Sequence, residues 1–366
     1  MKRLNVLTPF PVLERSGDQE VGITGVAFDS RRVEPGFLFV AMPGSAADGA
    51  AFIEDAVRRG AAAVVTQAPL AGIPVPAVRV TEARRALSAI ARLFHDDPSK
   101  DLHLVGITGT KGKTTATYLV QSILRKAYGA AFRFGTVEYD LGFDVRPAKN
   151  TTPESLDLSA LIAETRTKGV RAGVMEVSSH ALKSCRVEDL TFAAAGFSNL
   201  SLEHTEFHPD MEDYYQAKRR LFLDLTPADR GLVIGIDDAW GRRLADECRQ
   251  AGRNVCTVSV KGTADLYAAD IRLSGMATDF TLVTDGVKRP CRIALAGEFN
   301  VFNALMAAGL TRCLGIGWDT ILGGITSLAT VPGRFESIAN NRGVTVIVDY
   351  ARSEEHTSEL QSHHPI

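Results

Sequence analysis

Residues 102–128 contain an apolar run, a turn rich in glycine and threonine, and an amphipathic segment, and this succession constrains the fold most. The run LHLVGIT is typical of a buried strand, and GTKGKTT follows it directly. Glycines let backbone N–H groups approach an anion, and the N-terminus of a helix adds partial positive charge. The segment therefore predicts a phosphate-binding loop within an α/β fold. The apolar residues beyond the turn share one helix face: Ala116, Leu119, Val120, Ile123, Leu124 and Ala127.

The loop departs from the strict pattern G-x-x-x-x-G-K-[ST], because residue 107 is isoleucine where that pattern needs glycine. The match is the segment 109–115 instead. We expect Lys113 to place its charge on the β- and γ-phosphates and the hydroxyl of Thr114 to bind Mg²⁺. A glycine-rich turn without a ligand is the alternative. A switch GTPase, a kinase and a ligase would all carry such a loop, so the loop alone does not identify the reaction.

Strand-like and helical segments alternate along most of the chain, which predicts an α/β protein with a mainly parallel sheet covered on both faces. Residues 1–98 form a first unit, with strands at FLFVAM and AAAVV and helices at AFIEDAVRRG and EARRALSAIARLFHD. The polar segment HDDPSKD leads into a second unit, over residues 99–332. Residues 333–351, with the strand VTVIVDY, are the predicted start of a third unit.

The composition argues against several classes of function. The 366 residues carry a formal net charge of −2, so the chain lacks the excess positive charge that is typical of nucleic-acid-binding proteins. The sequence has no apolar run near the roughly 20 residues that a membrane helix needs. The five cysteines are odd in number and lack CxxC spacing. They favour reduced thiols in a cytoplasmic protein over a disulfide framework or a zinc site.

The final residues differ in character from the rest of the chain. Residues 352–366 are polar and hold three of the eight histidines. The stretch RSEEHTSELQS can be encoded by a common sequencing-adapter read, and we expect these residues to be non-native. A disordered tail or a tag is the alternative. On this expectation, the natural protein continues differently after Ala351.

Two polar groups lie downstream of the loop. Glu176 ends the strand AGVMEV at the carboxyl edge of the predicted sheet, where a carboxylate can hold Mg²⁺. For His208 we favour a structural role, because a single histidine is usually structural. Three polar residues follow shortly after Glu176: Ser178, Ser179 and His180. The second group, in SLEHTEFHPDMEDYYQAKRRLF, contains Glu203, His204, Glu206, His208 and Lys218.

Several stretches, taken in their order and spacing, resemble a known family. They are FDSRRVEPGFLFVAMPGSAADGAAFIEDAVRRGAAAVV, GITGTKGKTT, NTTPESLDL, MEVSSHAL, FSNLSLEHTEFHPDMEDYYQAKRRLF, GEFNVFNALMA, PGRFES and VIVDYA. The chain resembles the Mur ligases of peptidoglycan synthesis, and NTTPESLDL with MEVSSHAL is similar to their UDP-N-acetylmuramoyl-tripeptide synthetase (MurE) branch. The resemblance covers nearly all of residues 22–351.

The resemblance implies an ATP-dependent amide ligase. ATP would phosphorylate the free carboxylate of D-Glu in UDP-MurNAc-L-Ala-D-Glu, and the amine of a diamino acid, meso-diaminopimelate or L-lysine, would attack the acyl phosphate. ATP and Mg²⁺ are the implied cofactors. The implied protein is a cytoplasmic monomer with no nucleic-acid or membrane partner. Its domains would be an N-terminal uridine-binding domain, a central ATPase domain and a C-terminal Rossmann-like domain, the last of which is missing here.

The resemblance also assigns roles to residues. The catalytic residues would be Lys113, Glu176, His204 and Lys218. The metal site would consist of Thr114, Glu176, His204 and, if carbamylated, Lys218. The nucleotide would be held by Gly109, Thr110, Lys111, Gly112, Lys113, Thr114, Thr115, Asn300, Asn303, Arg334 and Asp349. The UDP-linked substrate would be held by Phe28, Ser30, Ser45, Ala46, Ala47, Asn150, Thr151, Thr152, Ser178, Ser184 and Arg186.

The chain departs from the family pattern in several places. Lys111 stands where the family usually has asparagine, and Ser45 and Ser184 stand where relatives often have histidine and glutamine. After Asp349-Tyr350-Ala351 the family continues into the domain that carries the amino-acid site. We therefore expect the chain as printed to have negligible ligase activity. A substrate- and nucleotide-binding fragment and another Mur-type ligase are the alternatives, and a nucleotide switch is disfavoured.

Overall fold

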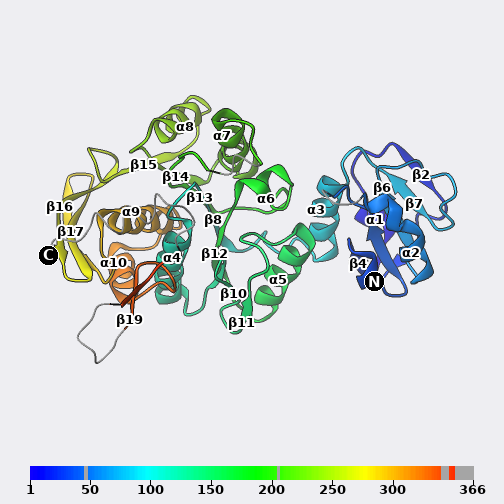
Figure 1. Ribbon diagram of the computed structural model, residues 1–366, viewed down its shortest axis with the longest axis horizontal. Helices are drawn as coiled ribbons and strands as arrows, with labels where there is room; N and C mark the ends of the chain where they lie inside the picture. The colour runs from blue at the N-terminus through cyan, green and yellow to red at the C-terminus, as the bar shows by residue number, and fades with distance from the viewer. Residues whose placement is uncertain (45–47, 204–206, 339–345, 351–366) are drawn as a thin grey trace.

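The computed structural model describes residues 1–44, 48–203, 207–338 and 346–350. Some of the predicted site residues lie outside this described part, and so do residues 352–366. These site residues are Ser45, Ala46, Ala47 and His204. The described chain is elongated, with a small sheet at one end and a much larger one in the centre (Figure 1).

The small sheet is built from the first 79 residues and has the strand order β2-β7-β6-β5-β4. Its four strands β4 to β7 are parallel, and β2 runs antiparallel at the edge. The predicted strands FLFVAM and AAAVV are β5 and β6, and both are almost wholly buried. The bounds are β2(Glu14–Ser16), β4(Gly25–Ala27), β5(Phe37–Val40), β6(Ala63–Thr66), β7(Ala77–Arg79), α1(Leu4–Leu7), α2(Ile53–Arg58) and α3(Ala83–Phe94), with a separate short pair β1(Lys2–Arg3) and β3(Gly22–Ile23).

The central sheet is parallel from β9 to β16 and ends in antiparallel hairpins on both sides. The prediction of a mainly parallel α/β sheet is confirmed, whereas the hairpins at its edges were not predicted. In spatial order the strands are β11(Val145–Pro147), β10(Glu138–Asp140), β9(Phe132–Phe134), β12(Ala172–Glu176), β8(His103–Thr108), β13(Ala194–Phe197), β14(Gly231–Gly235), β15(Val255–Ser259), β16(Leu266–Ser274), β17(Ala277–Thr284) and β18(Val287–Ile293).

Strand β8 shows why the sheet needs helices on both faces. Val105 and Ile107 belong to one buried cluster and Leu104 to another, because successive side chains of a strand point to opposite faces. The first face is covered by α4(Lys113–Tyr128), α9(Glu298–Cys313) and α10(Trp318–Ser327). The second is covered by α5(Ser155–Thr167), α6(Ser179–Lys183), α7(Met211–Arg220) and α8(Ala239–Gln250).

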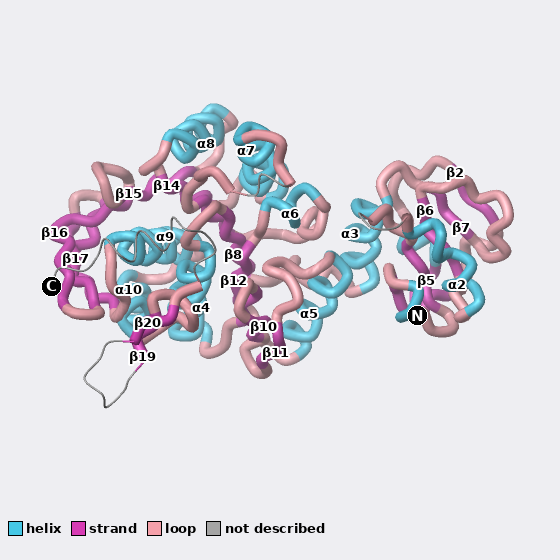
Figure 2. Tube along the Cα trace, viewed as in Figure 1, coloured by secondary structure: helices cyan, strands magenta, loops and turns pink. Residues whose placement is uncertain are grey.

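Helix α3 connects the two sheets and packs against α5 (Figure 2). Two ion pairs join the same parts of the chain, one between Arg84 and Glu154 at 3.6 Å and one between Arg32 and Asp157 at 3.3 Å. After α10 the chain forms a small antiparallel ribbon of β19(Glu336–Ile338) and β20(Val346–Val348). The last strand lies in the predicted segment VTVIVDY.

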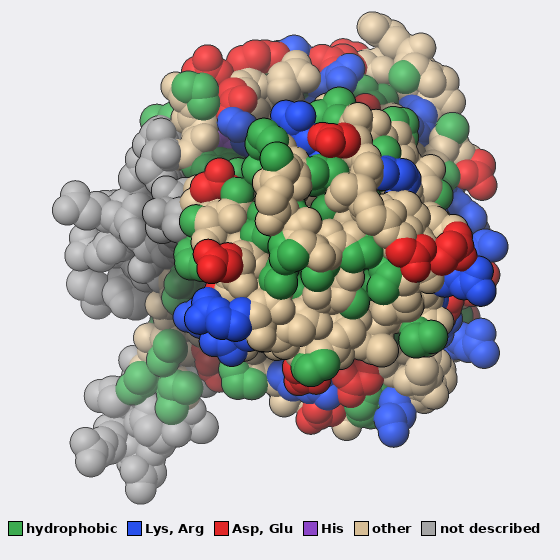
Figure 3. Space-filling view, turned by 90° about the vertical axis from the view of Figure 1, so that its right-hand side faces the viewer, with side chains coloured by type: hydrophobic (Ala, Val, Ile, Leu, Met, Phe, Trp, Pro, Cys, Tyr) green, Lys and Arg blue, Asp and Glu red, His purple; other side chains and the backbone are tan. Residues whose placement is uncertain are grey.

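The surface carries charges of both signs. Figure 3, which faces the end of the molecule formed by the small sheet, shows acidic and basic side chains interspersed. Within the described residues, no helix has both the length and the apolar character to cross a bilayer.

Candidate active site

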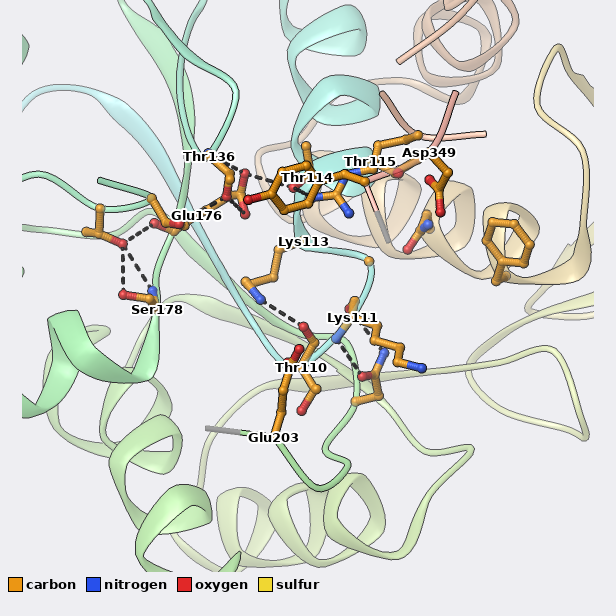
Figure 4. Close-up of a pocket in the computed structure, with 18 of the residues that line it drawn as sticks. Thr110, Lys111, Lys113, Thr114, Thr115, Thr136, Glu176, Ser178, Glu203 and Asp349 are labelled. Carbon is orange, nitrogen blue, oxygen red and sulfur yellow. Dashed lines mark hydrogen bonds between the residues drawn. The ribbon is translucent and has the colours of Figure 1, made fainter. Parts of the chain in front are cut away.

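A cavity of about 680 Å³ lies at the carboxyl ends of β8 and β12, and it gathers residues that are far apart in the sequence (Figure 4). This volume is within the range of small-molecule sites, about 300–1,000 Å³. The position agrees with the rule that open α/β sheets bind ligands at their carboxyl edge. Among the predicted site residues, those lining the cavity are Thr110, Lys111, Gly112, Lys113, Thr114, Thr115, Asn150, Thr151, Thr152, Glu176, Ser178, Arg186, Asn300, Asn303, Arg334 and Asp349.

Two glycines of the loop adopt backbone angles and contacts that other residues cannot. Gly109 has φ of 144°, and an added Cβ would lie 1.9 Å from the hydroxyl oxygen of Ser198. Gly112 has φ of 86°, and its Cβ would lie 2.5 Å from Oδ1 of Asn303. The loop is therefore shaped by close approach to two neighbouring segments as well as by its own turns.

Asn199, just beyond β13, fixes the loop from its other side. Its Oδ1 accepts the backbone N–H of Lys111 at 2.9 Å, and its Nδ2 donates to the Lys111 oxygen at 3.1 Å. The hydroxyl of Ser198 donates to the same oxygen at 2.7 Å. These bonds fix the loop against the segment that follows β13.

Lys113 lies at the first position of α4, where backbone N–H groups have no carbonyl partner within the helix. Its Nζ donates to the main-chain oxygens of Gly109 and Thr110, each at 2.9 Å. The cation is thus held over the loop beside the positive end of the helix. Both features attract a phosphate group.

Glu176 is only 1% exposed and receives three hydrogen bonds from neighbouring segments. The hydroxyl of Thr114 donates to Oε1 at 3.1 Å, and the backbone N–H of Thr136 donates to the same oxygen at 2.9 Å. The hydroxyl of Thr136 donates to Oε2 at 3.3 Å. An ionised carboxylate has about four acceptor sites, so Glu176 keeps one for a further donor or a cation.

Lys218 lies beneath the loop and is not part of the cavity wall. It is 1% exposed, and its Nζ donates to the Gly109 oxygen at 3.0 Å. The Nζ also lies 4.5 Å from the centre of the Tyr214 ring. Burial lowers the pKa of Lys218 well below its usual value, and the nearby charge of Lys113 lowers it further. A lowered pKa increases the share of neutral amine at a given pH, and a neutral amine can act as a nucleophile.

The residues predicted for the UDP-linked substrate form a connected wall around the end of β12. The hydroxyl of Thr152 donates to the Glu176 main-chain oxygen at 2.8 Å and accepts the backbone N–H of Ser178 at 3.1 Å. Arg186 donates to the Thr152 main-chain oxygen at 3.0 Å and pairs with Glu154 at 2.8 Å. This wall faces Lys113 across the cavity.

The residues predicted for the nucleotide lie at the opposite side. Arg334 donates from Nη2 to the Thr114 hydroxyl at 3.2 Å, which joins the segment after α10 to the loop. The carboxylate of Asp349 accepts the backbone N–H of Phe335 at 3.0 Å. Two partly exposed rings, Phe299 and Tyr350, also line this side and offer flat apolar surfaces.

The structure leaves some predicted residues away from this cavity. Phe28 and Ser30 lie in the small-sheet unit, and Ser184 lies just past the end of α6. Gly109 belongs to the loop but does not line the cavity, and Lys218 donates to its main-chain oxygen from beneath the loop. His204 and residues 45–47 lie outside the described part of the chain.

Sequence reasoning gave no role to several lining residues. His180 and Glu203 were noted as polar without a role, and the others were missed: Thr136, Asn199, Phe299, Phe335 and Tyr350. Thr136 gave no local signal, because its position beside Glu176 depends on the pairing of β9 with β12 in the sheet. The rings gave none either, since nothing in their local sequence distinguishes a cavity wall from an exposed surface.

Sequence comparison gives two family matches. The description "Mur ligase middle domain" matches residues 107–311, and "Mur ligase family, catalytic domain" matches residues 22–95. A UDP-N-acetylmuramoyl-L-alanyl-D-glutamate–2,6-diaminopimelate ligase of Geobacter sulfurreducens is 42% identical over 346 residues, which is 92% of this chain and 67% of that protein. The ligase of the same name from Bacillus velezensis is 37% identical and covers 96% of this chain and 72% of its own length.

Solved structures show the same relationship. A UDP-N-acetylmuramoyl-L-alanyl-D-glutamate–2,6-diaminopimelate ligase superposes with a TM-score of 0.84 at 26% identity, over 98% of this chain and 73% of that one. The MurF ligase of Thermotoga maritima in complex with ADP superposes with a TM-score of 0.65 at 22% identity, over 93% of this chain and 74% of that one, which shows a shared fold.

Proposed function

The chain belongs to the Mur ligase family. From this premise we propose that it is part of the ligase that joins a diamino acid to UDP-MurNAc-L-Ala-D-Glu at the expense of ATP. The relatives named above favour 2,6-diaminopimelate over L-lysine as the amino acid. The reaction would begin with phosphorylation of the free carboxylate of D-Glu. The amine would then displace phosphate from the acyl phosphate and form the amide.

The observation that carries this proposal is a single cavity with a phosphate-binding loop on one side and polar substrate-binding candidates on the other. The loop and Lys113 form the wall that suits a triphosphate, and Thr152, Ser178 and Arg186 form the opposite wall. A phosphoryl group and a carboxylate are both anions, so their approach needs positive charge and fixed orientation. Lys113, the positive end of α4 and Arg186 supply these from the chain itself.

The residues present also fit the Mg²⁺ that the family implies. Mg²⁺ is usually bound by one or two protein oxygens together with substrate phosphates. The described residues contain no cluster of three acidic, histidine or cysteine side chains, and Mg²⁺ does not require one. Glu176 has an acceptor site left, and the Thr114 oxygen lies beside it. When bound there, Mg²⁺ would neutralise charge on the phosphate oxygens. His204 is the third proposed ligand.

We also propose that Lys218 carries a carbamate. The neutral amine, whose share burial increases, would attack the carbon of carbon dioxide; the nitrogen would then lose a proton to solvent, and the product would be a carbamate anion. Burial of Lys218 next to the loop, close to Lys113, supports this assignment. The carbamate would replace the cation of Lys218 by an anion beneath the loop.

We further propose domain boundaries at residues 98 and 332, with residues 333–351 as the start of a third domain. The two separate sheets and the ribbon after α10 support this division. A cytoplasmic, monomeric protein is part of the same proposal. All five cysteines are free, as expected in a reducing compartment.

Calorimetric titration of the chain tests the proposed function without relying on turnover. We expect saturable binding of UDP-MurNAc-L-Ala-D-Glu and of Mg²⁺-bound AMP-PNP, a non-hydrolysable ATP analogue. UDP-MurNAc lacking the dipeptide is the matched control and should bind more weakly, because the Thr152 wall would have no partner. Failure to bind either ligand, or a preference for the guanine analogue, would contradict the proposal.

A further inference from the structure

A continuous chain of hydrogen bonds runs across the cavity floor, from the substrate side to the nucleotide side (Figure 4). The hydroxyls of Thr151 and Thr136 lie 3.0 Å apart, and Thr136 bonds to Glu176 through both its hydroxyl and its backbone N–H. Glu176 accepts from Thr114, whose oxygen accepts from Arg334. The family comparison assigns nothing to Thr136, which stands at the centre of this chain.

The Glu176 carboxylate, which accepts hydrogen bonds from both sides, sets the direction of every bond in this chain. An ionised carboxylate can only accept, so Thr136 must use its single hydroxyl proton on Glu176. Its oxygen then has to accept the proton of Thr151. By the same argument, Thr114 uses its proton on Glu176. Thr151 therefore presents lone pairs to the substrate side, and Thr114 presents its remaining lone pair to the metal side.

The turn that carries Thr136 is built to keep it in place. Arg133 is fully buried, and its Nη2 pairs with Glu138 at 2.8 Å, which closes the segment between β9 and β10. Gly135 leaves space for the carboxylate, since a Cβ there would lie 2.3 Å from Oε1 of Glu176. Gly135 and the Arg133–Glu138 pair thus hold Thr136 in position against Glu176.

We propose that Thr136 is a positioning residue that couples binding on the two sides of the cavity. This inference rests on the proposed function. Glu176 already sets the direction of the Thr151–Thr136–Glu176 bonds, and a substrate donor that engages the oxygen of Thr151 would restrict the movement of these side chains. Glu176 and Thr114 are then already aimed at the metal side when the nucleotide arrives. Each ligand therefore raises the affinity for the other, and by linkage the two effects are equal.

The variant Thr136→Val tests this coupling, because valine keeps the backbone N–H and the side-chain shape but removes the hydroxyl. Thr136→Ser restores the hydroxyl. Thr165→Val is the matched control, since Thr165 is a fully buried threonine of α5 whose hydroxyl bonds only to a helix oxygen, that of Ile162, in the described contacts. Each protein is titrated with Mg²⁺–AMP-PNP, with and without saturating UDP-MurNAc-L-Ala-D-Glu.

We expect the unmodified chain to bind the nucleotide at least about fivefold more tightly when the UDP-linked ligand is present. The ratio of the nucleotide affinities with and without the UDP-linked ligand should fall to about one in Thr136→Val. It should keep the value of the parent in Thr136→Ser and Thr165→Val. Thermal melts of the free proteins check that all three variants fold. A melting temperature within a few degrees of the parent supports a positioning role over a structural one.

The other outcomes separate this inference from the proposed function. If the parent binds both ligands but shows no coupling, or if Thr136→Val keeps the full ratio, the inference is wrong and the proposed function stands. Loss of coupling in Thr165→Val as well would also overturn it. If the parent binds neither ligand, the proposed function fails and the inference fails with it.

Discussion

The amine of Lys218 and the amine of Lys113 donate to the same main-chain oxygen, that of Gly109, at 3.0 and 2.9 Å. One lysine approaches the phosphate-binding loop from the cavity and the other from the protein interior. The charge of Lys113 also contributes to lowering the pKa of Lys218. The shared oxygen therefore connects a cation that suits phosphate with a buried amine that suits carbamylation.

Replacement of Lys113 by methionine should weaken nucleotide binding and leave the UDP-linked substrate unaffected. Hydrogen bonds to charged groups contribute about 1.5–3 kcal/mol, so the loss in affinity for Mg²⁺–AMP-PNP should be about 10- to 150-fold. Calorimetry with each ligand separately measures both effects. Lys111→Met is the control within the same loop and should cost less. Equal losses in the two variants would mean that total loop charge, and not the placement of Lys113, governs binding.

Gly112→Ala should disrupt the loop more than its backbone angle alone explains. A non-glycine residue in a left-handed conformation costs roughly 1–2 kcal/mol. Gly72 has a similar φ, 83° against 86°, but has no atom within 4 Å of an added Cβ. Gly72→Ala therefore isolates the strain, whereas Gly112→Ala adds a clash with Asn303. We expect a larger fall in melting temperature and a loss of nucleotide affinity in Gly112→Ala, and similar behaviour of both variants would contradict the described contact.

The loop and the parallel sheet could be predicted from sequence because their signals are local. The apolar run, the glycines and the helix periodicity all lie within residues 102–128. The antiparallel strands β16 to β18 were missed: β16 and β18 alternate weakly because many of their residues are exposed, whereas the alternation of β17 was overlooked. The burial of Lys218 could not be predicted either. It sits beside Arg219 and Arg220 in a basic stretch, and only the packing of α7 under the loop removes it from water.

Glu176→Gln should remove the Mg²⁺ dependence of nucleotide binding. The amide keeps the size of the side chain but carries no charge, and one of its two ends would present a donor to the N–H or hydroxyl of Thr136. ADP affinity measured with Mg²⁺ should fall to the level measured with EDTA. A variant that keeps its full response to Mg²⁺ would show that Glu176 does not hold the metal.

The stability of the chain should fall on acidification partly because of His208. Its ring bonds to Asp213 at 2.6 Å and to the Ser179 hydroxyl at 2.9 Å, and burial lowers the pKa of His208. Asp213 opposes that shift, whereas the charge of Lys183 adds to it. The unfolded chain, with a pKa of about 6.5 at this residue, then binds a proton more readily than the folded one. The contribution of His208 to the stability of the fold is therefore complete above about pH 6.5, and it is lost as the pH falls toward the pKa of His208 in the folded chain.

His208→Gln removes this titration while keeping polar atoms for Ser179 and Asp213. The difference in melting temperature between the parent and His208→Gln should be largest near neutral pH and smaller at about pH 5.5. The pKa of Asp213 is lowered by its bonds to Lys183 and His208, and its contribution is lost in the same direction at lower pH. A difference that stays constant with pH would exclude His208 as the titrating group.

Thr136 and Asn199 show why the candidate site was only partly predictable. Each is a single polar residue at the end of a short strand, and each acts by contacting a segment distant in sequence, Glu176 and Lys111 respectively. Strand order decides which ends meet, and that order is a property of the whole sheet. Residues inside recognisable motifs could be named from sequence, whereas residues that hold those motifs in place required the structure.

The most direct test of the account is a crystal structure of the chain with Mg²⁺–AMP-PNP and UDP-MurNAc-L-Ala-D-Glu bound together. We predict the γ-phosphate against Lys113 and the loop N–H groups, the metal on Thr114 and Glu176, and the free carboxylate of D-Glu facing that phosphate from the Thr152 wall. The account is contradicted if the two ligands occupy separate cavities, or if the triphosphate is bound without contact to Lys113.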